Sequence, residues 1–308
     1  MLQRYIGDRA FYRRVMGVAV PMIIQNGITN FVSLLDNIMV GQVGSLQMSG
    51  VSIVNQLMFV YNLCIFGGLS GAGIFTAQYY GQNDQEGIRN TFRFKIWMAI
   101  IITIAAIFIF LAGGSELISL YLNDSSSGNL AATLSYGEQY LLVMLLGLPG
   151  FMIVQIYAST LRECGETVVP MAAGIVAVFT NLIGNYLLIF GKCGFPELGV
   201  AGAAIATALS RYVELVIVVI WTHYNKEKNP YIVGLYRTLK LPTALTKDIL
   251  AKGTPLLLNE TFWSMGMAAL TQCFPELNHR EIESYIKNNP SRRYYVVAKQ
   301  LTYEEISD

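Results

Sequence analysis

Two asparagines lie four residues apart inside the apolar stretch TNLIGNYLLIFG, residues 180–191. Asn181 and Asn185 therefore share one face of a helix. Their amide oxygens suit a hard monovalent cation or a proton relay. Asparagines in membrane helices also join neighbouring helices by plain hydrogen bonds, and the spacing favours neither interpretation. Proximity of this pair to the acidic Asp36 would favour ion binding.

Asp36 stands in the apolar run near residues 15–40. A carboxylate near the membrane centre costs about 2.5–3.5 kcal/mol on insertion scales, so we expect it to face a cavity or a partner. The alternative is a solvated position near the outer interface, because Gly41 and Gly44 follow closely. Pro21 in the same run lacks a backbone donor, which predicts a hinge.

Arg211 and Glu214 are three residues apart in the run near residues 199–221 and can pair on one helix face. We favour a structural ion pair, and the alternative is a pair that breaks during conformational change. Thr207 adds a hydroxyl to the preceding stretch of small residues, which lets helices approach closely.

The elements that carry these residues are long apolar runs. They lie near residues 15–40, 51–75, 94–113, 139–158, 168–190 and 199–221, and a seventh begins near Thr254. Each approaches or exceeds the roughly 20 residues that a membrane-spanning helix needs. Because the runs are continuous rather than alternating, barrel strands are excluded. The sequence predicts an all-α polytopic membrane protein, with transport as the leading function.

Composition agrees, since 54% of the residues are hydrophobic, 13% are charged and the mean hydropathy is +0.46. Lysine and arginine collect at residues 4–14, 89–95 and 226–252, whereas residues 114–140 contain none. The positive-inside rule therefore predicts a multi-pass protein of the cell membrane with a cytoplasmic N-terminus. Its expected partners are the lipid bilayer and small molecules, and no nucleic acid.

Several classes of site are absent from the sequence. The four cysteines and two histidines lack metal-ligand spacing, so we expect no metal beyond Na⁺ at a cation site. Neither a paired-aspartate site nor a histidine cluster supports an intramembrane enzyme. Residues 71–81 are rich in glycine but lack the lysine and strand context of a nucleotide-binding loop. We therefore predict a protein that is not an enzyme and has no cofactor besides a coupling ion.

An internal repeat links the first and seventh runs. VPMIIQNGITNF, from Val20, aligns by its proline with TPLLLNETFWSM, from Thr254, and places Asn26 opposite Glu260. The copies are offset by six helices, an even number, so both enter the membrane from the same side. The repeat predicts a twelve-helix parent built from two six-helix lobes.

The sequence resembles the multidrug and toxic compound extrusion (MATE) transporters from about Met1 to Thr271. The resemblance rests on Pro21 with Asp36 and Gly41, and on GAGIFTAQYYGQND, STLRECGETVVP, NLIGNYLLIFG and PELGVAGAAIATALS. It implies antiport coupled to Na⁺ or H⁺, which exports cationic, amphipathic compounds by alternating access between two lobes. It also implies an N-lobe cation site of Asp36, Asn181, Asn185 and Thr207, with Glu260 as the acid of the C-lobe.

We expect four segments: a six-helix N-lobe (1–225), a basic cytoplasmic inter-lobe linker (226–253), a seventh helix (254–272) and an atypical polar tail (273–308). The tail is charged and lacks a run of spanning length, so we interpret it as foreign or frameshifted sequence rather than a small soluble appendage. The chain would then be a truncated half-transporter that cannot alternate access alone. Self-association of two such halves could rebuild two lobes, but nothing in the sequence requires it.

The alternative within transporters is a lipid-linked oligosaccharide flippase, whose relatives share the two-lobe plan. A flippase needs a strongly cationic cavity for pyrophosphate. Because Arg211 is the only cation expected well inside a spanning segment, and Glu214 is expected to neutralise it, the sequence favours drug export.

Overall fold

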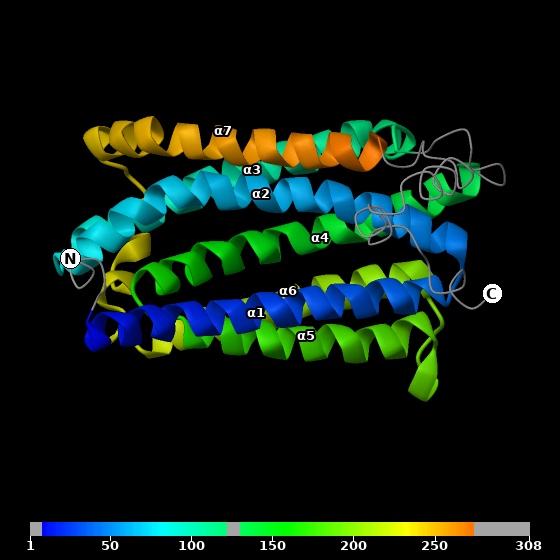
Figure 1. The fold of residues 1–308 in the computed structure, drawn as a ribbon, viewed down its shortest axis with the longest axis horizontal. Coiled ribbons are helices and arrows are strands. Elements are labelled where there is room, and N and C mark those ends of the chain that lie inside the picture. Colours follow the sequence, from blue (N-terminus) through cyan, green and yellow to red (C-terminus); the bar gives the residue numbers. More distant parts are fainter. Residues whose placement is uncertain (1–7, 122–129, 274–308) are drawn as a thin grey trace, which may run out of the picture. The chain divides into compact units, whose positions relative to one another are not determined.

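The computed structural model describes residues 8–121 and 130–273, which form seven α-helices and three short 3₁₀ helices, with no strand in these ranges (Figure 1). The α-helices are α1 (Arg9–Gly41), α2 (Ser45–Gly81), α3 (Gln85–Ser119), α4 (Leu130–Glu163), α5 (Val168–Ile189), α6 (Gly199–Tyr224) and α7 (Thr243–Cys273). The short ones are η2 (Lys192–Gly194), η3 (Pro230–Ile232) and η4 (Leu235–Arg237). The prediction of an all-α protein is confirmed. Residues up to Phe262 form one compact unit, to which the following description applies.

Helices α2 to α6 are long and apolar enough to cross a membrane. In α1 only Val15–Ile28 is comparably apolar, because polar residues such as Asp36 and Asn37 occupy its second half. Its 33 residues still exceed the roughly 20 that span the hydrocarbon core. The helix continues through Pro21, and the hinge there stays a prediction.

Small residues set the packing around α6. A Cβ on Gly202 would lie 2.5 Å from the carbonyl oxygen of Leu188, and one on Gly184 would lie 2.9 Å from the Cβ of Ala206. Helices α5 and α6 therefore approach closely, as the run of small residues predicts. Helix α1 packs along α5, and α4 packs on α6 (Figure 1).

A buried ion pair joins α3 to α4. Lys95 is completely buried and donates to Glu163, Ser159 and Thr160. Lys95 belongs to the cationic group at residues 89–95 that entered the positive-inside argument, but it lies inside α3 and is buried rather than exposed at a membrane surface. Helix α3 begins at Gln85, where Asp84 accepts from the backbone amides of residues 86 and 87.

One face of α3 also holds the segment after α6. Arg89, Arg93 and Trp97, spaced by four residues, donate to backbone carbonyls of residues 231, 234, 235 and 239 at 3.0–3.2 Å. Tyr231 and Leu235 belong to this segment and are buried, and burial raises the pKa of Tyr231. We call these three side chains and their carbonyl partners the α3 clasp.

The seventh helix begins earlier than its apolar run. Helix α7 starts at Thr243, within the segment that we assigned to the linker, so the boundary at residue 254 is wrong. Polar and charged residues interrupt residues 243–253, so hydropathy does not detect an apolar run there. Lysine, leucine and alanine in this segment nevertheless favour a helix. Residues 274–308, which contain almost all of the predicted polar tail, lie outside the described ranges.

Candidate functional site

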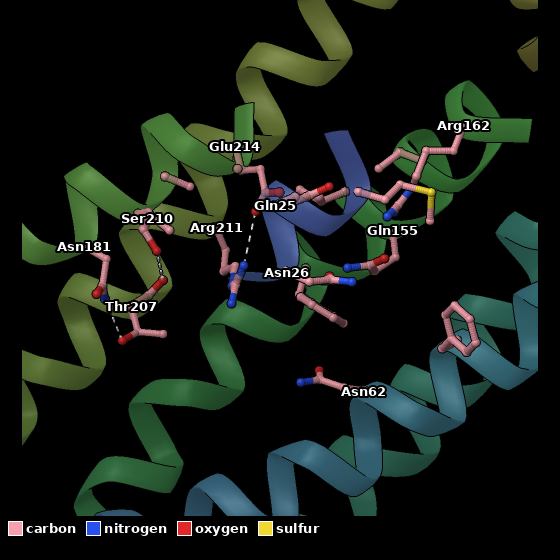
Figure 2. A pocket seen from close by; sticks show the side chains of 18 of the residues that line it. Gln25, Asn26, Asn62, Gln155, Arg162, Asn181, Thr207, Ser210, Arg211 and Glu214 are labelled. Atoms are coloured by element: carbon pink, nitrogen blue, oxygen red, sulfur yellow. Dashed lines mark hydrogen bonds and ion pairs between the residues drawn. The ribbon is translucent and has the colours of Figure 1, made fainter. Parts of the chain in front are cut away.

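Helices α1, α2, α4, α5 and α6 enclose a cavity of about 440 Å³, here called the main cavity (Figure 2). Its polar lining comprises Gln25, Asn26, Asp36, Asn62, Gln155, Arg162, Asn181, Thr207, Ser210, Arg211 and Glu214. A second cavity of about 280 Å³ shares Asp36, Asn62, Thr207 and Arg211 with it. These four residues therefore stand between the two cavities.

Asp36 meets the two asparagines of α5. The Nδ2 of Asn185 donates to Oδ1 of Asp36 at 2.5 Å. Asn181 and Asn185 are 5% and 1% exposed, so these contacts are shielded from solvent. The structure thus brings together the carboxylate and the amide pair on which the ion-binding interpretation depends.

Thr207 on α6 completes the cluster through Asn181. The hydrogen-bond network assigns the Asn181 amide so that Nδ2 donates to Oδ1 of Asp36 at 2.8 Å and the amide oxygen accepts from Oγ1 of Thr207 at 3.0 Å. Both asparagines of α5 then donate to Asp36, which suits a charged carboxylate.

One oxygen in this cluster lacks a partner. The buried Oδ1 of Asn185 accepts no hydrogen bond from any residue that the structure describes. Buried amide oxygens are nearly always satisfied, and carboxylate, amide and hydroxyl oxygens together suit a hard cation. The donor set therefore fits a bound monovalent cation. Glu260, the remaining predicted member of the cation sites, lies on α7, and its side chain is outside the described part of the chain.

Arg211 and Glu214 form an ion pair with 3.2 Å between Nη1 and Oε2. The Glu214 side chain is 7% exposed, whereas that of Arg211 is 35% exposed and reaches into the main cavity (Figure 2). The guanidinium carbon also lies 5.5 Å from the ring centroid of Phe151 on α4. The pair is therefore part of the cavity wall rather than a contact on the lipid-facing surface.

The sequence analysis missed several lining residues. Asn62, Gln155 and Arg162 line the main cavity, and Tyr140, which donates to Asn55, lines the second. Their signal was available, since each is a polar residue within or directly after an apolar run. Arg162, at the end of α4, adds a second cation to the lining of the main cavity beside Arg211.

The chain is similar to known proteins in both sequence and structure. The protein-family description MatE matches residues 21–187. A protein of Thermotoga maritima described as "Probable multidrug resistance protein NorM" is 28% identical over 257 residues, which cover 83% of this chain and 53% of that protein. "Multidrug resistance protein MdtK" of Pectobacterium atrosepticum is 28% identical over 221 residues, covering 72% and 46%.

A solved structure gives the same fold. It is described as the outward-facing conformation of a multidrug resistance MATE family transporter, and it is similar with a TM-score of 0.72 at 21% identity. The similarity covers 90% of this chain and 58% of that one. The chain spans about half the length of the curated relatives that it matches.

Proposed function

We propose that this chain, which belongs to the MatE family of transporters, takes part in secondary active export of cationic, amphipathic compounds. Its coupling ion would be Na⁺ or H⁺, and its proposed location is the cell membrane with the N-terminus in the cytoplasm. Alternating access by a whole two-lobe protein is part of this proposal, in which Glu260 serves the C-lobe. Family membership supports a membrane transporter rather than an enzyme.

The observation that carries the proposal is the convergence of Asp36, Asn181, Asn185 and Thr207 from three helices. A buried carboxylate is costly unless a cation or a proton neutralises it. Na⁺ and H⁺ would therefore compete for one place between α1, α5 and α6. The orphan oxygen of Asn185 would accept the cation.

Coupling requires that the ion and the exported compound favour different states. Asp36 is on α1, while the two amides that donate to it are on α5, so ion binding would alter the restraint on α1. Bending near Pro21 would then change access to the main cavity. This role for Pro21 is the hinge expected from the missing backbone donor.

The charges of the main cavity disfavour a flippase of lipid-linked oligosaccharides. The described lining residues include two cations, Arg162 and Arg211, and two acids, Asp36 and Glu214, so this part of the lining has no net positive charge for a pyrophosphate. The described lining residues also give this cavity no net negative charge that would attract a cationic drug.

Ethidium binding to the chain in lipid nanodiscs tests the proposal. We expect ethidium to bind, Na⁺ or H⁺ to weaken that binding, and Asp36→Asn to remove the ion dependence. Asp248→Asn, an exposed acid on α7, is the matched control and should behave as the wild type. Failure of the wild type to bind ethidium, or equal ion dependence in Asp36→Asn, would contradict the proposal.

A further inference from the structure

The guanidinium of Arg211 occupies a place in the main cavity that has the features of a ligand site. It donates to the Glu214 carboxylate at 3.2 Å and lies 5.5 Å from the centroid of the Phe151 ring. An acidic oxygen together with an aromatic face is how proteins recognise organic cations. Arg211 therefore makes the contacts that an external planar cation would make, and Figure 2 shows its ion pair with Glu214.

The guanidinium is itself a planar, delocalised and weakly hydrated cation on a long side chain. Its single hydrogen bond to Glu214 leaves other donors free of protein partners among the described residues. A fully committed structural pair of arginine and carboxylate commonly uses two parallel bonds. With only one hydrogen bond to Glu214, the Arg211 side chain can be displaced from that carboxylate by another cation.

A second acid is available to Arg211. Arg211 follows Thr207 by one helical turn on α6, so Arg211 lies beside the cluster that contains the second acid, Asp36. Asp36 and Arg211 line both cavities and interact electrostatically, although Glu214 is the acid paired with Arg211 here. Arg162 lines the same cavity as Glu214, Arg211 and Asp36. Two positive and two negative groups thus share the wall of the main cavity.

We propose that Arg211 is a tethered competitor, an internal cation that holds the subsite formed by Glu214 and Phe151 until a planar aromatic cation displaces it toward Asp36. This inference rests on the proposed function and names the subsite and substrate class. A cation or proton on Asp36 leaves Arg211 no second acid, which keeps the subsite closed. An empty, charged Asp36 attracts Arg211 and opens the subsite. Ion and drug thus exclude each other through one side chain.

Ethidium affinity of Arg211 variants in nanodiscs tests this inference. Arg211→Gln should lower the ethidium dissociation constant at least tenfold, because the competitor is gone, and should reduce the effect of Na⁺ or H⁺ on binding. Arg211→Lys keeps a charge and should stay nearer the wild type. Arg237→Gln, on the exposed linker, is the matched control. An unchanged or higher dissociation constant in Arg211→Gln overturns the inference.

Loss of the Arg211 charge leaves two acids in the cavity, so a second design protects against misfolding. The double variant Arg211→Gln/Glu214→Gln removes both charges of the pair. It should bind ethidium at least tenfold less tightly than Arg211→Gln if that variant folds. If it does not, Phe151→Leu should raise the wild-type dissociation constant at least fivefold. An unchanged constant in either test overturns the inference.

The two proposals fail in different ways. A wild-type chain that does not bind ethidium, or binds it without ion dependence, contradicts the proposed function. A wild type that binds with ion dependence, together with an Arg211→Gln variant of unchanged affinity, leaves the proposed function intact and refutes only the tethered competitor.

Discussion

Asn185 on α5 donates a hydrogen bond to Asp36 on α1 at 2.5 Å, although 149 positions separate the two residues. The contact links the helix that contains Pro21 to the tightly packed pair of α5 and α6. It also leaves the second polar atom of the Asn185 amide buried without a partner among the described residues. The predicted hinge and the candidate cation site are therefore connected by one side chain.

Replacement of this amide should weaken ion binding. Asn185→Leu removes the donor to Asp36 and the orphan oxygen, so the ion should bind more weakly. The concentration of Na⁺ or H⁺ that half-reverses ethidium binding should therefore rise at least tenfold. Thr180→Val, on the exposed side of α5, is the control. An unchanged ion affinity in Asn185→Leu would remove Asn185 from the site.

The buried pair of Lys95 and Glu163 should matter for stability. Removal of one partner from a buried pair costs about 3–5 kcal/mol, and we expect the lower end for Lys95→Met because the Glu163 side chain keeps 18% exposure. Lys95→Met/Glu163→Leu should recover part of the loss, whereas exposed Lys192→Met should lose nothing. Denaturant unfolding in detergent measures the differences, and equal stability of wild type and Lys95→Met would refute this account.

Close approach of α5 and α6 should make Gly202 intolerant of a side chain. Gly202→Ala places a Cβ 2.5 Å from the Leu188 carbonyl oxygen, so the helices must separate, at a cost of about 1–3 kcal/mol. Gly17→Ala meets nothing within 4 Å and should leave stability unchanged or slightly higher. Thermal unfolding of the two variants compares them. The packing argument fails if Gly202→Ala is as stable as Gly17→Ala.

The α3 clasp should restrain the segment after α6. Arg93→Leu removes two donors to the carbonyls of Gly234 and Leu235, so amide hydrogen exchange in residues 231–239 should speed up by about tenfold. Exchange in the middle of α5 serves as the internal reference and should not change. Equal exchange rates in residues 231–239 would show that other contacts hold this segment.

Periodicity and polarity predicted part of the site. The four-residue spacing of Asn181 and Asn185 determines their shared face, and a lone carboxylate in an apolar run must have a partner. Their meeting depends on tertiary packing, for which the family resemblance was needed. Arg162 was not predicted to line a cavity, because a charged residue that follows an apolar run is readily interpreted as exposed to water.

Lys95 shows the same difficulty in the fold. Its partner Glu163 is 68 positions away, and hydropathy contains no information on such pairs. The start of α7 was missed for a related reason, because charged residues in residues 243–253 continue a helix without being apolar. The continuous apolar runs therefore located the helices well. The ion pairs and the polar ends of the helices depend on three-dimensional contacts that these runs do not contain.

The most direct test of the central claim is infrared difference spectroscopy of the chain in lipid, with Na⁺ exchanged for choline and, separately, with H⁺ varied. The account predicts a carboxyl signal that responds to at least one of these ions, disappears in Asp36→Asn and persists in Asp248→Asn. A signal that is the same in Asp36→Asn as in the wild type would contradict the assignment of the cation site to Asp36.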